Sequence, residues 1–301
     1  MVAAELIFNF FQGDIFSNET VKDAVRAALT DIGAAEREGI FVRVREYPLK
    51  GRTAWRMNLP GGKSVFVKLD ELGRSGKWYH RFYLLHPFAQ EARMLVRLRG
   101  AYLKVPQPLL TAYEPGRFFP RKVFLVTEAL DDYEPLGVTI NRHGDNASDI
   151  PKELSDDLPI VLAQFLAKLH KMGFFHRGLQ GDHMLWRMDS AGIQWAMVDL
   201  EGAFLRRPFP MWYRIKSLYM IGRHLLANYL PEASVNFISE YHRLSFKKDD
   251  PASFIRTVLM YAAFRQENRA LSAKSDKTIM DRLRFARRHW RIPIFRLWFG
   301  F

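Results

Sequence analysis

Apolar and polar residues alternate in three segments that follow one another from Phe41, "FVRVREYPL", "TAWRMNL" and "SVFVKLD". A short "PGG" turn separates the second from the third. Such alternation is typical of strands that bury one face, and a Pro/Gly turn between two of them favours a hairpin. The later segments "VPQPLLTAYE" and "KVFLVTEAL" are expected to be two more strands. The pattern predicts a small antiparallel sheet.

Three other segments repeat their apolar residues at helical spacing. "SNETVKDAVRAALTDIG" begins with a capping residue, Ser17 or Asn18, and is expected to end at Gly33. "FAQEARMLVRLRG" is expected to be the main helix among the strands, and "LPIVLAQFLAKLHKMG" opens a mostly helical remainder. The expected apolar faces are Phe88, Ala92 and Leu95 in the second helix, and Leu162, Phe165, Leu166 and Leu169 in the third.

This order of elements predicts three regions. Residues 1–39 are expected to form an N-terminal helical extension, residues 40–130 a small sheet-rich lobe, and residues 131–301 a larger, mainly helical lobe with a basic, aromatic C-terminal tail. The polar stretch "NRHGDNASDIPKELSDD" is expected to be a loop. Because ligand sites often lie where two lobes meet, we expect a cleft at the junction.

Composition narrows the function only in part. The chain has 45 Lys and Arg against 32 Asp and Glu, a net charge of +13, which favours anionic partners such as phosphorylated substrates, an acidic membrane surface or nucleic acid. The absence of cysteine excludes disulfides, thiolate zinc sites and cysteine nucleophiles. The opening segment has no basic start, and no apolar run approaches the ~18 residues of a membrane span, so we expect neither a signal peptide nor a spanning helix.

Three charged residues stand where phosphoryl transfer from ATP needs a phosphate cation, its partner and a metal ligand. Lys68, in "VFVKL", would point away from the flanking Val67 and Leu69; the alternative is an ordinary exposed strand lysine. Glu91, in the next helix, would hold Lys68, or else is a solvated helix glutamate. Asp199, directly after an apolar strand in "WAMVDLEGAF", would bind Mg²⁺, or else caps a turn.

The order of these residues, together with "FLVTEAL", "HRG…H" and "VDLEGA", resembles the protein-kinase-like superfamily, and within it the bacterial lipopolysaccharide core kinases that act on Kdo or heptose. The motif "WYRIKSL", at residues 212–218, adds to the likeness, which extends over roughly residues 40–245. The resemblance implies an α+β, protein-kinase-like bilobal fold. Its N-lobe would be a small antiparallel β-sheet with one main helix, and its C-lobe larger and mainly α-helical.

The resemblance also implies ATP and Mg²⁺ as cofactors. The backbone around Glu128 to Leu130 would face adenine, and the turn "KGRTAW", which contains Arg52, would cover the phosphates. His183 stands where the family has an asparagine metal ligand. The implied cofactor-binding residues are Lys68, Glu91, Glu128, Leu130 and Arg52, and the implied metal ligands are His183 and Asp199.

The loop that would carry the chemistry departs from the family pattern. Two residues after His176, where the family has the aspartate that accepts the acceptor's proton, stands Gly178. Asp182 is expected to substitute, with Gly178 and Gly181 allowing unusual backbone angles that carry it inward; alternatively, the glycines mark a loop released from catalysis. The candidate catalytic residues are therefore Asp182 and His176, and Ser217, in place of an aspartate of the heptose kinases, is a second departure.

Arginine and aromatic residues interleave in the C-terminal tail, "DRLRFARRHWRIPIFRLWFGF". This composition suits peripheral contact with the anionic inner face of the inner membrane; the alternative is a terminal helix packed on the large lobe and broken at Pro293. The segment "GRSGKWYHRFYLLHPF" has a similar mixture. No helix-turn-helix, zinc-finger or RNA-binding strand pattern is present, so nucleic acid is disfavoured.

Two functions follow from these features. The first is an ATP-dependent kinase of lipopolysaccharide core biosynthesis, in the cytoplasm, that phosphorylates a Kdo or heptose hydroxyl of the core or of another acidic glycolipid. The second is a catalytically inactive pseudokinase that binds nucleotide, glycolipid or a protein partner and regulates or scaffolds envelope assembly. The two functions differ in whether the chain is active without the usual catalytic aspartate, which is replaced by Gly178.

Overall fold

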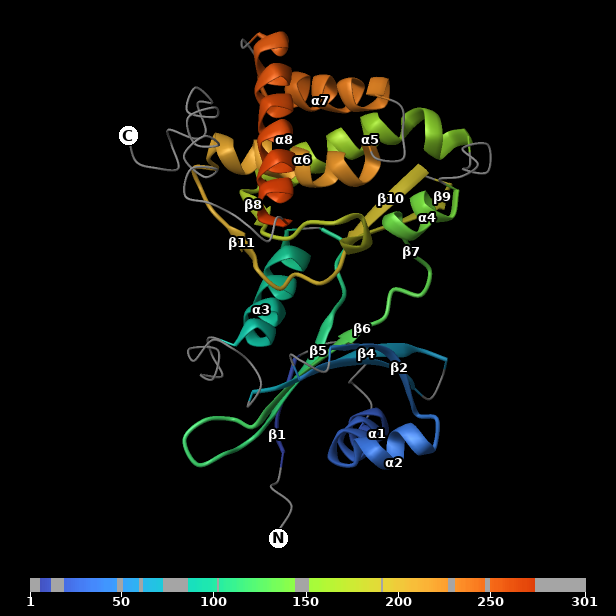
Figure 1. The fold of residues 1–301 in the computed structure, drawn as a ribbon. Helices are drawn as coiled ribbons and strands as arrows, with labels where there is room; N and C mark the ends of the chain where they lie inside the picture. Colours follow the sequence, from blue (N-terminus) through green and yellow to red (C-terminus); the bar gives the residue numbers. More distant parts are fainter. Residues whose placement is uncertain are drawn as a thin grey trace. The chain divides into compact units, whose positions relative to one another are not determined.

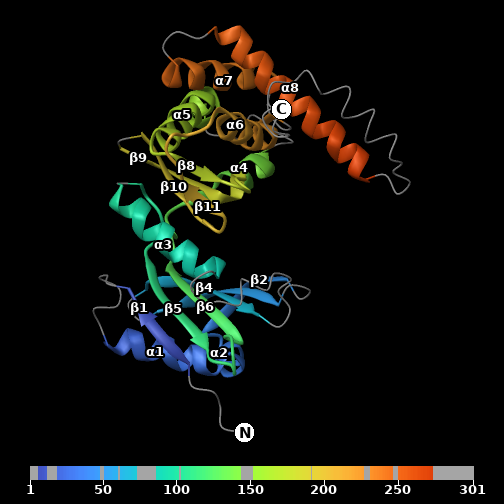
Figure 2. The ribbon, with the colours of Figure 1, turned by 90° about the vertical axis from the view of Figure 1, so that its left-hand side faces the viewer.

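The computed structural model describes residues 6–11, 19–47, 51–59, 62–72, 86–101, 103–143, 152–190, 192–226, 231–246 and 250–273. The chain divides into two compact units (Figures 1 and 2). The first comprises Met1–Glu134, Leu185–Arg187 and Gln194–Ala203, and the second Pro135–Met184, Met188–Ile193 and Phe204–Phe301. The predicted C-terminal tail and residues 73–85 of the second aromatic segment lie outside the described residues.

Six strands of the first unit form one antiparallel sheet in the order β1-β5-β6-β4-β3-β2 (Figure 1). The five predicted strands are confirmed, whereas β1 was not expected. Its four residues pair with β5 at the edge of the sheet. The bounds are β1 (Ile7–Phe10), β2 (Phe41–Tyr47), β3 (Arg52–Asn58), β4 (Ser64–Glu71), β5 (Pro108–Glu114) and β6 (Lys122–Glu128).

Helices cover both faces of this sheet (Figure 2). They are α1 (Glu19–Thr30) and α2 (Ile32–Arg37) on one face and α3 (Pro87–Gly100) on the other. Strand β6 shows why both faces are apolar: Phe124 and Val126 join the core cluster that contains residues of α1 and α2, and Val123 and Leu125 join the cluster that contains residues of α3. Successive strand residues point to opposite faces, so this central strand is apolar at nearly every position.

The first predicted helix ends earlier than expected. Helix α1 stops at Thr30, and Gly33 lies inside the short helix α2. The break comes from Asp31, whose side chain caps α2 by accepting a hydrogen bond from the backbone N–H of Ala34 at 2.8 Å. A capping aspartate therefore outweighed the glycine as a boundary signal.

The second unit is mainly helical, as predicted. The predicted loop at residues 141–157 is shorter than expected, because α4 extends into it and α5 begins within it. No described helix combines the length and apolarity that crossing a membrane requires. The helices are α4 (Leu136–His143), α5 (Lys152–Lys171), α6 (Met211–Leu226), α7 (Pro231–Ser245) and α8 (Pro251–Ala273).

Five short strands complete the described fold. The sequence predicted one of them, the apolar strand before Asp199, which is β10. Strand β8 pairs with β11, and β10, β9 and β7 form a three-stranded sheet in that order. A single 3-10 turn, η6 (Gly181–His183), precedes β9. The strands are β7 (Glu134–Pro135), β8 (Phe174–His176), β9 (Met184–Asp189), β10 (Gly192–Met197) and β11 (Ala203–Leu205).

A buried polar chain ties α5, α6 and α7 together. Arg214 Nη1 donates to the Tyr241 hydroxyl at 2.9 Å, and that hydroxyl lies 2.6 Å from Nδ1 of His170. Burial, assisted by the charge of Arg214, holds the pKa of His170 well below its usual value. The imidazole is therefore neutral and can accept the hydroxyl proton of Tyr241 at Nδ1.

Acidification is expected to destabilise the protein through His170. Unfolded, His170 takes up a proton near pH 6.5, whereas the folded chain resists protonation; the free energy of unfolding should therefore fall as the pH drops from 6.5 towards the lowered folded pKa. The slope from this residue reaches at most ~1.4 kcal/mol per pH unit. Urea unfolding at pH 7.5 and 5.5 should show a larger loss for the wild type than for His170→Gln. Equal losses would contradict the assignment.

Candidate functional site

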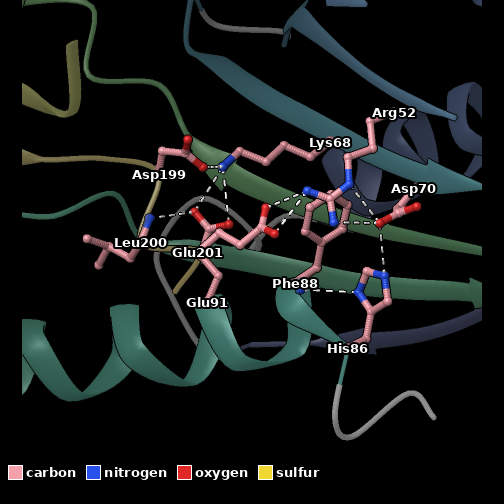
Figure 3. Close-up of polar contacts among 9 residues, drawn as sticks. All are labelled: Arg52, Lys68, Asp70, His86, Phe88, Glu91, Asp199, Leu200 and Glu201. Atoms are coloured by element: carbon pink, nitrogen blue, oxygen red, sulfur yellow. Dashed lines mark hydrogen bonds and ion pairs between the residues drawn. The ribbon is translucent and has the colours of Figure 1, made fainter. Parts of the chain in front are cut away.

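Lys68 lies on β4 and points away from the α1/α2 core. Its neighbours Val67 and Leu69 are 0% and 5% exposed and belong to that core. On the opposite face, Lys68 Nζ lies 3.0 and 3.1 Å from the two carboxylate oxygens of Glu91 and 2.7 Å from Oδ1 of Asp199 (Figure 3). The structure thus brings three predicted site residues together within the first unit.

Glu91 is buried rather than solvated. It lies on α3, is 2% exposed, and accepts a hydrogen bond from the backbone N–H of Leu200 at 3.1 Å (Figure 3). Glu91 therefore holds both Lys68 and the backbone next to Asp199. Asp199 itself has a positive φ of 53°, which is uncommon for a residue other than glycine, although aspartate adopts it more readily than most. Such strained positions often occur at functional sites.

The charges of this cluster are strongly coupled. Burial alone would lower the pKa of Lys68, but the Glu91 and Asp199 carboxylates outweigh it and raise that pKa. Burial also raises the pKa of Glu91, although Lys68 opposes the change. At neutral pH, Lys68 is therefore firmly protonated and available to bind an anion.

A second ion-pair system lies beside the first. Arg52 donates through Nε to Asp70 Oδ2 at 2.9 Å and through Nη1 to both carboxylate oxygens of Glu201 at 2.9 and 2.7 Å (Figure 3). Glu201 follows Asp199 by two residues, so Arg52 and Lys68 both attach the segment 199–201 to the sheet. Charge-assisted hydrogen bonds from one guanidinium to two carboxylates fix the orientation of Arg52.

The Arg52 system extends to the start of α3. Asp70 and His86 are both 0% exposed, and His86 Nε2 lies 3.3 Å from Asp70 Oδ2. Nδ1 of His86 accepts the backbone N–H of Phe88 at 3.2 Å and so caps the helix that carries Glu91. One chain of contacts, buried at Asp70 and His86 and partly exposed at Arg52 and Glu201, therefore joins the helix cap, the sheet and the segment after Asp199.

The predicted phosphate-covering turn at residues 50–55 is wrong for its larger part. Residues 52–55 belong to strand β3, and Arg52 pairs with Asp70 across the ladder. Gly51, with φ 63°, is the turn residue. The prediction missed Asp70, His86 and Glu201. Asp70 could have been predicted from the sequence. Residues two apart on a strand share a face, and Lys68 was already a candidate site residue.

The fit to a magnesium-bound nucleotide can be judged from these charges. The two ion-pair systems contain two cationic and four anionic side chains: Arg52, Lys68, Asp70, Glu91, Asp199 and Glu201. An excess of carboxylates repels a polyphosphate unless a divalent cation intervenes, and Mg²⁺ usually takes one or two protein carboxylates and completes its shell with phosphates and water. Asp199, whose side chain is 46% exposed, suits this role.

The imidazole of His183 suits magnesium less well than an oxygen ligand does. No set of three His, Cys, Asp or Glu side chains in the described part of the chain is arranged to hold a metal ion. The donor chemistry therefore favours Asp199 over His183 as the ligand.

Glu128 and Leu130 lie where β6 ends. The backbone N–H of Glu128 donates to Gln107 O at 2.9 Å, and the Glu128 carboxylate accepts the N–H of Gln107 at 3.1 Å. Leu130 is 7% exposed and packs with Leu185 and Ala196. The adenine-facing role of this segment stays a prediction.

The remaining candidates lie in the second unit. His176 is 2% exposed, and its Nδ1 accepts the backbone N–H of Gly178 at 3.2 Å. The rings of His176 and His183 are 5.2 Å apart in an edge-to-face arrangement. Buried in this way, His176 is placed to shape the loop rather than to meet a substrate.

Asp182 is exposed and packs on the first turn of α4. A Cβ built on Gly137 would lie 2.0 Å from Oδ1 of Asp182, so a side chain at position 137 would displace this carboxylate from its present place. Gly181 likewise touches Gly137, since a Cβ on Gly181 would lie 3.1 Å from its Cα. The two glycines allow α4 and the loop to approach closely.

The expectation of unusual backbone angles in this loop is wrong. Neither Gly178 nor Gly181 has a positive φ. Gly178 is also not enforced sterically, because a Cβ there would meet nothing closer than Cε1 of His176 at 4.0 Å. The backbone at position 178 would therefore accept a residue other than glycine.

Solved structures with a similar fold include WaaP in complex with acyl carrier protein. That match has a TM-score of 0.55 and 20% sequence identity, and it covers 78% of this chain and 92% of WaaP. The amicoumacin kinase hAmiN, in complex with AMP-PNP, Ca²⁺ and Ami, matches with a TM-score of 0.43 and 13% identity over 90% of this chain and 95% of that one. No curated protein sequence gives a significant match.

The likeness to WaaP and the α+β architecture confirm the predicted protein-kinase-like bilobal fold. The family model described as "Lipopolysaccharide kinase (Kdo/WaaP) family" matches residues 48–246, which is more than half of the chain. The matched range includes Lys68, Glu91, Asp182 and Asp199. The chain belongs to the lipopolysaccharide kinase (Kdo/WaaP) family.

Proposed function

We propose that the chain binds ATP with Mg²⁺ at the Lys68 cluster and transfers a phosphoryl group to a Kdo or heptose hydroxyl of the lipopolysaccharide core. The supporting observation is the assembled set of Lys68, Glu91 and Asp199, in which a protonated lysine bridges a buried and an exposed carboxylate. Phosphoryl transfer depends mainly on positioning and on charge stabilisation, and this set supplies both.

Each residue of the set has a separate task in this proposal. Lys68 binds phosphate oxygens, and Glu91 keeps its ammonium group in place. Asp199 holds the metal ion, and ATP with Mg²⁺, when bound, supplies the phosphoryl group and neutralises its charge. Arg52 positions residues 199–201 through Glu201 rather than touching phosphate. The backbone near Glu128 and Leu130 binds adenine.

Asp182 accepts the proton of the acceptor hydroxyl in this proposal. Its carboxylate is exposed, and it lies in the turn η6 of a loop whose shape is fixed by Gly137 and His176. A carboxylate at this place replaces the aspartate that Gly178 has removed from the family pattern. His183, adjacent in η6, is the weaker candidate for a second metal ligand.

Nucleotide binding should appear as thermal stabilisation. Mg-ATP at 100 times its dissociation constant is expected to add ~2.7 kcal/mol to the free energy of unfolding. Differential scanning fluorimetry of the wild type, with and without Mg-ATP, should show this shift, and Lys68→Ala and Asp199→Ala should lose it. Lys63→Ala, at an exposed lysine just before β4, should keep it. The absence of any shift in the wild type would contradict the nucleotide site.

A pseudokinase is the second candidate, and Gly178 favours it. No side chain occupies the position of the usual base, although the backbone would accept one. Such a protein would bind nucleotide, glycolipid or a protein partner without turnover. Prolonged incubation with Mg-ATP and dephosphorylated core oligosaccharide separates the two, since phosphate incorporation above a no-enzyme control would exclude the inactive alternative.

A further inference from the structure

Lys216 lies half-buried on α6 among aromatic rings and has no acidic partner among the described residues. Its Nζ is 5.4 Å from the ring centroid of Phe175 and 5.9 Å from that of Trp212. Cation–π contacts stabilise an ammonium group only modestly and do not replace a counter-ion. The ammonium group of Lys216 is therefore partly desolvated, and no described carboxylate neutralises it.

Two arginines add to the positive charge at this place. The pKa of Lys216 is lowered by burial first, and then by repulsion from Arg265 and Arg177. Arg265 comes from α8, which packs against α6, and Arg177 from the loop directly after β8, which α6 also contacts. Arg177, Lys216 and Arg265 are called here the cationic cluster. Three converging positive charges destabilise the free protein unless an anion joins them.

The cationic cluster adjoins the candidate catalytic loop within the second unit. Arg177 directly precedes Gly178, and α6, which carries Lys216, contacts the turn η6 that contains Asp182. Arg177 is exposed, and its guanidinium carbon lies 5.7 Å from the ring centroid of Phe204. Phe204 packs on Phe175 with a centroid distance of 5.2 Å. Arg177, over Phe204, and Lys216, over Phe175, therefore contact two adjacent rings.

We propose that the cationic cluster binds a phosphate or carboxylate group of the saccharide acceptor. The planar guanidinium groups of Arg177 and Arg265 can each donate two hydrogen bonds to the oxygens of such a group. Lys216 contributes the charge of its ammonium group, next to the rings of Phe175 and Trp212. This inference rests on the proposed function, because that function supplies a saccharide as the ligand. It adds residues outside the nucleotide site and gives the acceptor an anionic group near its reacting hydroxyl.

Binding without nucleotide tests the site independently of phosphate transfer. In calorimetric titrations, a dephosphorylated core oligosaccharide with intact Kdo carboxylates should bind Lys216→Met and Arg265→Gln at least about tenfold more weakly than the wild type, since each loses a charge-assisted contact. Lys216→Arg should restore most of the affinity. Arg256→Gln, at an exposed arginine of the same helix α8, is the matched control and should bind like the wild type.

Thermal stability gives a readout that a purely structural lysine would not give. Lys216→Met keeps a long unbranched side chain next to Phe175 and Trp212 but removes the repelled charge. The free variant should therefore melt at the same temperature as the wild type or higher, while binding the oligosaccharide more weakly. A lower melting temperature together with unchanged binding would overturn the proposal.

Further binding experiments identify the molecule that carries the anionic group. Inorganic phosphate should compete with the oligosaccharide, and reduction of the oligosaccharide carboxylates to alcohols should weaken binding to the wild type more than to Lys216→Met. If the variants lose only their binding to vesicles with anionic head groups, the site belongs to a lipid surface and the acceptor assignment is wrong. If oligosaccharide binding behaves as expected but no phosphate is transferred, the cationic cluster stands and the kinase proposal fails.

Discussion

Asp182→Asn is expected to lower the rate constant of phosphoryl transfer about 10²–10⁴-fold, which is the usual contribution of a general base. The amide keeps the size of the carboxylate but cannot accept the acceptor's proton. Nucleotide binding should not change, because Lys68 and Asp199 belong to the other unit and contact each other there. Single-turnover transfer from labelled ATP to dephosphorylated core oligosaccharide measures the effect.

Three further measurements test whether Asp182 acts as a base. Asp189→Asn changes an exposed aspartate of the same unit and should retain wild-type transfer. If Asp182 bound magnesium instead, the asparagine variant would recover activity as the Mg²⁺ concentration rose. Gly137→Ala should resemble Asp182→Asn, because its methyl group would lie 2.0 Å from Oδ1 of Asp182 and must displace it. Wild-type transfer by Asp182→Asn would exclude Asp182 as the base.

Gly178→Asp is expected to raise transfer by about 10²–10⁴-fold when introduced into Asp182→Asn, because it returns a proton acceptor to the family position. The structure accepts the change: a Cβ at position 178 meets only His176 Cε1 at 4.0 Å, and its φ is not positive. The same single-turnover assay applies.

Gly178→Asn is the matched control for this gain, since it has nearly the same shape and cannot act as a base. It should leave Asp182→Asn as slow as before. If the aspartate and asparagine variants behave alike, position 178 does not reach the acceptor. If instead the wild type is inactive and Gly178→Asp alone creates activity, the natural chain is a pseudokinase disabled at this single position.

The sequence predicted the parts of the fold that repeat a simple pattern. Alternation in β4 placed Lys68 opposite Val67 and Leu69, and helical spacing placed Leu162 and Leu166 in the core, where both are buried. These elements satisfy one local rule along their length, so the pattern suffices. The five main strands and the mainly helical second part followed from the same rules.

The missed elements depend on distant partners. Strand β1 has four residues and exists because it pairs with β5, about a hundred residues further along the chain. Strands β8 and β11 are three residues each and, among the described strands, form a sheet of their own. A run of three or four apolar residues predicts nothing by itself, because strand formation then rests on packing and pairing rather than on local preference.

The candidate site was predictable only where charged residues had recognisable spacing. Lys68, Glu91 and Asp199 stood in a known order, and the structure brings them together. Arg52 was assigned to a phosphate-covering turn because its partners Asp70 and Glu201 lie 18 and 149 residues away in sequence. Contacts at such separation follow from the folded sheet and leave no periodic signal.

The packing of α1 and α2 against the sheet bears on where this chain can be shortened. The family match begins at residue 48, yet Val25 and Leu29 share one buried core with Trp55, Val65 and Val67. A fragment cut at the family boundary would expose these strand residues and remove two strands from the sheet. The sheet that carries Lys68 is therefore expected to need residues before position 48 in order to fold.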